Sequence, residues 1–187
     1  MNEPLWMGPT KCDEQRDKRQ KDIDNVWQEL ISSDEYTKTY PLFDSAIDLL
    51  REATSCYQNG AYMATAIMCR SMVETFLYYS VTRQVTQRWQ DTGTVASWQV
   101  QTLSDDKYGV VLQGAKTKYA IEGKIEKIMN DIRHEGNFAA HYGSGLDKRD
   151  VSTIKKKDTW INRQHALLLL RKTVTVIKYL YKQSVAA

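Results

Sequence analysis

The chain has 187 residues, a length that favours one domain and suffices to bury a sizeable core. Its 26 lysines and arginines against 23 aspartates and glutamates leave a net charge of only +3, which permits a polyanionic partner without requiring one. Three cysteines without a close pair argue against a disulfide framework and against a cysteine zinc site.

Motifs that the sequence lacks exclude further classes of protein. No apolar run approaches the roughly 20 residues of a membrane-spanning helix, and the N-terminus has no apolar secretory leader. No Gly-x-x-x-x-Gly-Lys-Ser/Thr loop, no His-Glu-x-x-His helix and no Gly-x-Ser-x-Gly elbow occurs. We therefore expect a cytoplasmic protein with no membrane partner, no metal and no cofactor.

Residues 1–40 are expected to form a tail and a peripheral helix outside the main bundle. All three prolines, the strongest helix breakers, lie within the first 41 residues. Residues 12–31 carry an apolar stripe at helical spacing, which predicts an amphipathic helix: Ile23, Val26, Trp27, Leu30 and Ile31. The polar run that follows ends this helix.

Two helices joined by a short turn are expected between residues 41 and 83. Pro41 suits the first turn of a helix, and Asn59-Gly60 is typical of a helix end. The second helix is expected to run from about Ala61 to Arg83. Because the connection is so short, the two helices should form an antiparallel hairpin.

Residues 84–114 are expected to be an insertion rich in polar residues. Apolar and polar residues alternate around Ser104-Asp105-Asp106-Lys107, so a small β-hairpin fits. A loop with a short helix fits the same residues equally well.

The C-terminal part predicts two more helices. The first spans about Lys116 to Arg133, and Gly136-Asn137 should interrupt it. Residues 143–161 are expected to be a loop, and the last helix should run from about Asn162 to Gln183. Residues 41–187 thus predict an all-α, antiparallel up-down bundle of four long helices, to which the N-terminal helix is added.

The densest polar cluster is the string Arg-His-Glu-Gly-Asn-Phe-Ala-Ala-His, which runs from Arg133 to His141. On a straight helix these two ends would lie about 12 Å apart along the axis and about 80° apart around it. A break at Gly136-Asn137 could bring them together, because glycine tolerates the required dihedral angles. A two-fold dimer could do the same with a second copy.

A second polar pair lies inside an apolar helix. Arg70 and Glu74 are four residues apart, so they can interact along one helix face. If that face points inwards the two charges must be paired, because a lone buried charge is very costly.

These residues, together with Gly60-Ala61-Tyr62 and Tyr179-Leu180-Tyr181, resemble the HEPN superfamily (higher eukaryotes and prokaryotes nucleotide-binding). The resemblance covers roughly residues 42–183 and is greatest to a bacterial branch labelled a domain of unknown function. It implies a helical bundle that is usually a homodimer. Active relatives are metal-independent endoribonucleases with an Arg-x(4–6)-His motif at the dimer interface. Arg133 and His141 occupy the matching positions, with seven residues between them.

The resemblance also implies roles for single residues in RNA cleavage by attack of the 2′-hydroxyl. His141 would move the protons, since imidazole titrates near neutral pH, and Arg133 would stabilise the charge on phosphorus. Asn137 would orient a phosphate or His141, and His134 fits the polar position after the motif arginine. Glu74 and Arg70 would hold the motif residues. The expected setting is a toxin or an anti-phage defence effector, with RNA as substrate.

Structural interpretations of the same residues remain open. His141 could simply cap the helix break, and Arg133 could pair with Glu135 or Glu74. Lys155, Lys156 and Lys157 could bind a nucleic-acid backbone, but aspartates lie among the neighbouring residues, so a solvated loop is the alternative. The alternative function is a non-catalytic dimerisation or docking module of a larger defence or nucleic-acid-processing complex. Binding of a nucleotide between the helices is a third interpretation.

Overall fold

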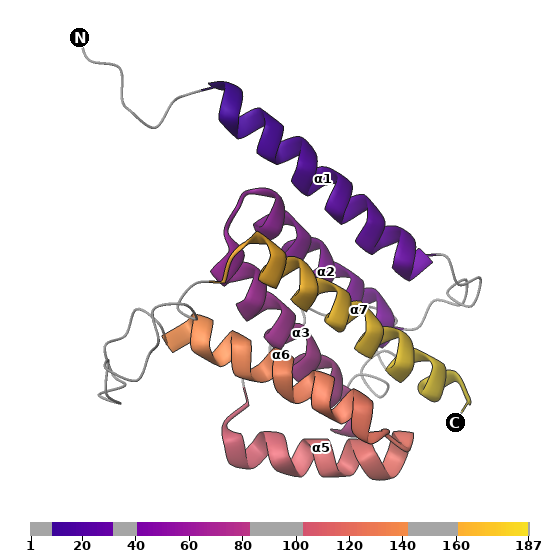
Figure 1. Cartoon of the computed structure of the whole chain (residues 1–187). Coiled ribbons are helices and arrows are strands. Elements are labelled where there is room, and N and C mark those ends of the chain that lie inside the picture. The colour runs from indigo at the N-terminus through magenta and orange to yellow at the C-terminus, as the bar shows by residue number, and fades with distance from the viewer. Residues whose placement is uncertain (1–8, 32–40, 83–102, 142–160, 187) are drawn as a thin grey trace.

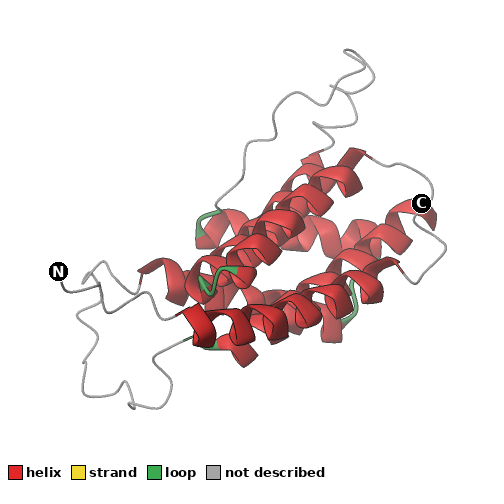
Figure 2. Ribbon diagram, turned by 90° about the horizontal axis from the view of Figure 1, so that it is seen from above, coloured by secondary structure: helices red, strands yellow, loops and turns green. Residues whose placement is uncertain are grey.

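A computed structural model describes residues 9–31, 41–82, 103–141 and 161–186 of the chain. These residues form an all-α bundle, which confirms the predicted fold class (Figures 1 and 2). The helices in chain order are α1 (Pro9–Ile31), α2 (Pro41–Gln58), α3 (Tyr62–Thr82), α5 (Asp105–Tyr119), α6 (Gly123–His141) and α7 (Arg163–Ala186). Within this part of the chain, every helix is too short or too polar to cross a membrane.

The centre of the bundle is α3, which packs against α2, α5, α6 and α7. Every residue from Cys69 to Leu77 is buried, so this stretch is enclosed on all sides rather than on one face. A helix that is buried all round belongs in the interior of a helical protein. The two charged residues of that stretch, Arg70 and Glu74, are therefore carried into the core.

The turn between α2 and α3 is built on Gly60, whose φ of 76° lies in the left-handed region that glycine adopts without strain. The Gly60 N–H donates to the Tyr57 carbonyl at 3.0 Å, and the Ala61 N–H donates to the Cys56 carbonyl at 2.9 Å. This pair of bonds closes the helix end in a Schellman motif. The predicted antiparallel hairpin is confirmed.

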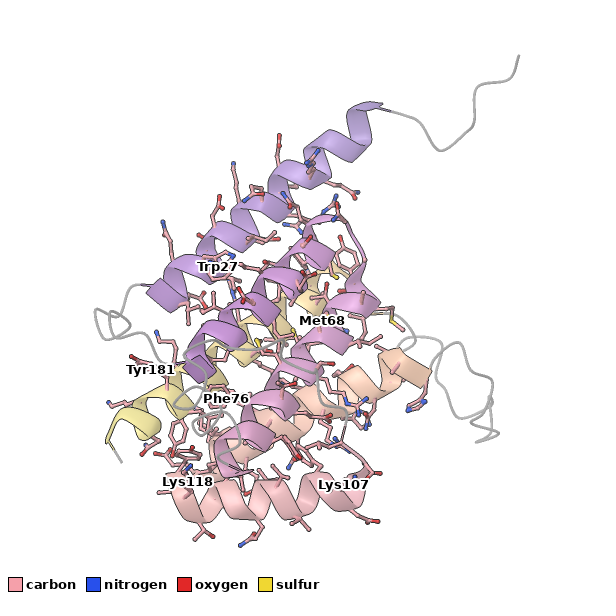
Figure 3. All side chains as sticks on the ribbon, turned by 180° about the vertical axis from the view of Figure 1, so that it is seen from behind. Trp27, Met68, Phe76, Lys107, Lys118 and Tyr181 are labelled. Carbon is pink, nitrogen blue, oxygen red and sulfur yellow. The ribbon has the colours of Figure 1, made fainter. Side chains whose placement is uncertain are left out.

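The peripheral helix α1 lies along α2 and α7, as predicted for an amphipathic helix (Figure 1). Ile23, Val26 and Leu30 are buried, and Trp27 packs against the core (Figure 3). A polar contact adds to this packing, because the Asp22 carboxylate accepts hydrogen bonds from the Tyr57 hydroxyl and from Arg163. Burial and the bond to Asp22 raise the pKa of Tyr57.

The boundaries between residues 105 and 141 differ from those predicted. Residues 105–119 form the helix α5, so the β-hairpin is wrong for this part of the insertion, while residues 84–102 lie outside the described residues. The helix predicted over residues 116–133 is two helices, because Ala120 adopts a left-handed conformation (φ 47°) that ends α5. The predicted break at Gly136-Asn137 is also wrong, since α6 continues through it to His141.

The last helix matches its prediction closely, and α6 and α7 run antiparallel. The Tyr179 hydroxyl donates to the Ala120 carbonyl at 2.7 Å, near the start of α6, and Lys172 pairs with Asp131 at 2.7 Å further along. The apolar seam of α7 is buried in the core: Leu170, Val174, Ile177 and Tyr181. This packing holds one side of α6, and α3 holds another.

Candidate functional site

The crossing of α6 over α3 explains why residue 136 is a glycine. A Cβ atom at this position would lie 2.9 Å from Arg70 Cδ and 3.0 Å from the Ala66 carbonyl oxygen, and closer still to Arg70 Cβ. Only glycine fits such a close approach of two helices without displacing one of them. The glycine therefore allows α6 to pack closely on α3, and it does not bend α6. This packing brings Arg133, one turn before Gly136, within reach of α3.

A buried carboxylate lies at this crossing. Glu74 is 1% exposed, and its Oε1 accepts a hydrogen bond from Arg70 Nε at 2.9 Å and another from Arg133 Nη1. Its Oε2 accepts the Leu103 N–H at 2.9 Å. Both oxygens are thus bonded, as a buried charge requires. The Arg70–Glu74 pair confirms the prediction from their spacing.

The other edge of the Arg133 guanidinium faces α5. Nη2 donates to the Leu103 carbonyl at 3.1 Å and to the Asp105 carboxylate at 2.6 Å. The guanidinium also lies over the Tyr108 ring, with its carbon 4.2 Å from the ring centroid. We call Arg70, Glu74, Asp105 and Arg133 the charge cluster. It lies at the start of α5, of which Asp105 is the first residue; Lys107 is labelled at this end of the helix in Figure 3.

The members of the charge cluster differ sharply in exposure. The side chains of Arg133 and Glu74 are 9% and 1% exposed, whereas that of Asp105 is 90% exposed and reaches Arg133 from the surface. The hydrogen bond from Arg133 lowers the pKa of Asp105, so this carboxylate stays ionised. Burial raises the pKa of Tyr108 to about 12, which keeps its ring neutral beneath the guanidinium.

The surface of α6 beside Arg133 is exposed and polar. His134 and His141 are exposed and Asn137 is half-buried; we call these three residues the α6 outer face. Two residues that are seven positions apart on an α-helix differ by only about 20° around the axis and about 10.5 Å along it. The two imidazoles therefore lie on one side of the helix, with Asn137 between them in the sequence.

The family model for a domain of unknown function (DUF4145) matches residues 51–182. The chain belongs to the DUF4145 family. No curated protein and no solved structure matches the chain. The matched residues contain the charge cluster and the α6 outer face but leave out α1 and the start of α2. Both candidate sites are therefore part of the DUF4145 domain itself.

Arg133 and His141 do not meet within one copy of this DUF4145 domain. The helix between them is continuous, Arg133 is buried and His141 is exposed. The interpretation of Arg133 as the ion-pair partner of Glu74 is confirmed. His141 lies at the last position of α6 rather than at a break within it. Lys155, Lys156 and Lys157 lie outside the described residues.

Three members of the site were missed in the sequence: Leu103, Asp105 and Tyr108. Leu103 contributes main-chain atoms, which no side-chain pattern can indicate. Asp105 had a usable signal, since a serine followed by two acidic residues is typical of a helix N-terminus. In the part of the chain that the structure describes, no group of three histidine, cysteine or acidic side chains could hold a metal ion.

Proposed function

We propose that this DUF4145 domain is a metal-independent endoribonuclease of the HEPN type. The observation that carries the proposal is the α6 outer face, where two imidazoles and a carboxamide share one exposed side of a helix. Cleavage of RNA by its own 2′-hydroxyl requires a base for that hydroxyl and an acid for the leaving oxygen. Imidazole can serve both needs near neutral pH without a metal ion.

His141 is proposed as the base that removes the proton of the ribose 2′-hydroxyl. The oxygen then bonds to phosphorus, the bond from phosphorus to the 5′-oxygen breaks, and a second imidazole protonates the leaving oxygen. The products are a 2′,3′-cyclic phosphate and a 5′-hydroxyl. His134 is the second imidazole on the same face, and the carboxamide of Asn137 can donate to a phosphate oxygen.

A homodimer would complete the site. The main-chain positions of His134 and His141 are about 10.5 Å apart along the helix. At this separation the two imidazoles of one chain are poorly placed to act on the same phosphate. A two-fold axis across the α6 outer face would place a second copy of each imidazole opposite the first. The resemblance to HEPN ribonucleases supports this arrangement, and it supports a toxin or anti-phage effector as the biological setting.

Arg133 takes a different part in this proposal from the one that the motif implies. Its guanidinium is bonded to Glu74, Asp105 and the Leu103 carbonyl, so it positions α6 instead of contacting the reacting phosphate. Removing it should act through the placement of α6.

The test is cleavage of a 5′-labelled single-stranded RNA by the full chain in EDTA. We expect His141→Ala to lower the rate by about 100-fold or more, the usual contribution of a general acid or base. His165→Ala is the matched control, because His165 is exposed on α7, outside the α6 outer face. RNA that stays intact with the unmodified chain, or equal cleavage by the chain and by His141→Ala, would refute the proposal.

The second candidate function is a non-catalytic HEPN-like module for dimerisation or docking onto a larger complex. The contacts of Arg133 favour it, because both terminal nitrogens of the guanidinium are bonded within the chain, to Glu74, to Asp105 and to the Leu103 carbonyl, and not to a scissile phosphate. Light scattering separates the two candidates. A dimer that persists in His141→Ala while the unmodified chain leaves RNA intact supports the module, and a monomer that binds no partner in pull-downs contradicts it.

A further inference from the structure

We propose that the Asp105 carboxylate occupies a phosphate-binding position beside Arg133, and that a backbone phosphate of RNA takes its place when substrate binds. Asp105 is then an autoinhibitory contact in the chain's own site. This inference rests on the proposed function, because the phosphate belongs to the RNA substrate.

The charge balance of the cluster is the first argument. Two guanidiniums, Arg70 and Arg133, share the single buried carboxylate of Glu74. The charge that completes the balance comes from Asp105, whose side chain is 90% exposed. Without Asp105 the cluster has one positive charge in excess at the edge that faces the solvent. This net positive charge would attract an anion.

The geometry of the contact is the second argument. Arg133 Nη2 lies 2.6 Å from Asp105 Oδ1, a charge-assisted hydrogen bond between a guanidinium and an oxyanion. Guanidinium binds phosphate oxygens with the same planar donors that it offers to a carboxylate. The Asp105 side of this pair is exposed to solvent, while Arg133 is also held by Glu74 and by the Leu103 carbonyl. The Asp105 side chain can therefore swing away without disturbing the core.

The start of α5 adds to the attraction. Asp105 is the first residue of this 15-residue helix, and the preceding Ser104 makes no side-chain capping bond. The first N–H groups of a helix have no partner within it, and the helix dipole favours negative charge there. A phosphate in place of the carboxylate would meet Arg133 and this helix end together.

The proposed phosphate position leads directly to the α6 outer face. Arg133, Asn137 and His141 are spaced four residues apart on one continuous helix. Each step is about 6 Å along the axis and about 40° around it, so the three residues form one inclined row. An RNA strand anchored beside Arg133 can follow this row past Asn137 to His141. Arg133 would bind a flanking phosphate, not the one that is cleaved.

The test compares Asp105→Asn with Asp106→Asn in the full chain. Asp106 is the matched control, because it is exposed and lies one position further along α5. The first readout is the midpoint of thermal unfolding against the concentration of inorganic phosphate, with chloride at equal ionic strength. The second is affinity for a single-stranded oligonucleotide whose 2′-hydroxyls are replaced by hydrogen, which prevents cleavage.

We expect phosphate to raise the midpoint of Asp105→Asn and to leave the unmodified chain and Asp106→Asn almost unchanged. Affinity of Asp105→Asn for the oligonucleotide should rise about tenfold or more, because one negative charge beside the guanidinium is gone. Asp105→Glu, which keeps the charge, should behave like the unmodified chain. Asp105→Ser provides the same test if the asparagine variant does not fold.

Equal responses of Asp105→Asn and Asp106→Asn would overturn the inference. A gain for inorganic phosphate without a gain for the oligonucleotide would overturn the assignment to RNA and assign the position to a free phosphate ion. If the gain occurs while the unmodified chain fails to cleave RNA, the anion position stands and the proposed function fails. If RNA is cleaved but no gain occurs, the function stands and the inference fails.

Discussion

Glu74 is the residue on which the interior charges depend. Its carboxylate is the only buried anion among the described contacts of Arg70 and Arg133, and it also accepts the Leu103 N–H. Because Arg133 of α6 and the Leu103 N–H, just before α5, both bond to this side chain of α3, it links three segments that lie far apart in the sequence. Replacing it tests whether the cluster stabilises the fold.

Glu74→Gln should lower the free energy of unfolding by about 3–5 kcal/mol, since two buried guanidiniums lose their shared counter-charge. Urea unfolding followed by circular dichroism measures this. Glu126→Gln is the control, because the pair of Glu126 with Lys116 is partly exposed, and such pairs contribute about 0–1 kcal/mol. Equal losses in the two variants would contradict a stabilising role for the cluster.

At the scale of elements, the contact of α6 with α3 requires a residue without a side chain. Gly136→Ala should cost about 1–3 kcal/mol, because its Cβ meets Arg70 and the Ala66 carbonyl. Gly109→Ala is the control in α5, where nothing lies within 4 Å of an added Cβ. There the same change should be neutral or gain up to about 1 kcal/mol through helix propensity. Chemical denaturation measures both, and a loss at Gly109 alone would refute the explanation.

Sequence periodicity predicted four of these elements well and misplaced two boundaries for identifiable reasons. The stripes of α1, α2, α3 and α7 stand out because each packs a face or its whole circumference against the bundle. The end of α5 is hidden in the sequence by the isoleucines at helical spacing that follow it from Ile121. The left-handed residue that ends this helix is Ala120, and an alanine does not indicate a helix end as a glycine would. Gly136 was predicted to break the helix because the sequence does not show that Arg70, on another helix, packs against it and leaves no room for a side chain.

The candidate site divides in the same way. The Arg70–Glu74 pair could be predicted, because four residues on one helix face fix their distance. The contact of Arg133 with Glu74 was one of two alternatives, and the crossing of α6 over α3 decides between them. The contribution of Leu103 could not be predicted, because main-chain atoms carry no sequence signal and their position depends on the assembled bundle.

At the scale of the whole molecule, α1 stands apart from the rest. It precedes the residues that the family model matches, and one apolar stripe packs it against the bundle. Polar contacts add to this packing: the bonds of Asp22 to Tyr57 and Arg163, and further bonds made by Lys18, Arg19, Gln20 and Glu29. Elements with few buried contacts open independently of the core. We therefore expect α1 to exchange its amide hydrogens faster than α3.

Asp22→Asn should weaken the attachment of α1 by about 1–2 kcal/mol, which is about a tenfold rise in local opening, because charge-assisted hydrogen bonds are lost. Hydrogen exchange of the full chain, read by mass spectrometry, should show the change in α1 and not in α3. Asp24→Asn is the control, because Asp24 is exposed and bonds only to Gln20 among its described contacts. A uniform rise across both helices would show that α1 and the core open together.

Leu103 binds the bundle through its main chain as well as through its buried side chain. Glu74 accepts its N–H, and Arg133 donates to its carbonyl, so these two bonds do not depend on the identity of the side chain. A substitution at Leu103 other than proline therefore leaves both bonds possible, and its cost falls on the packing of the buried side chain.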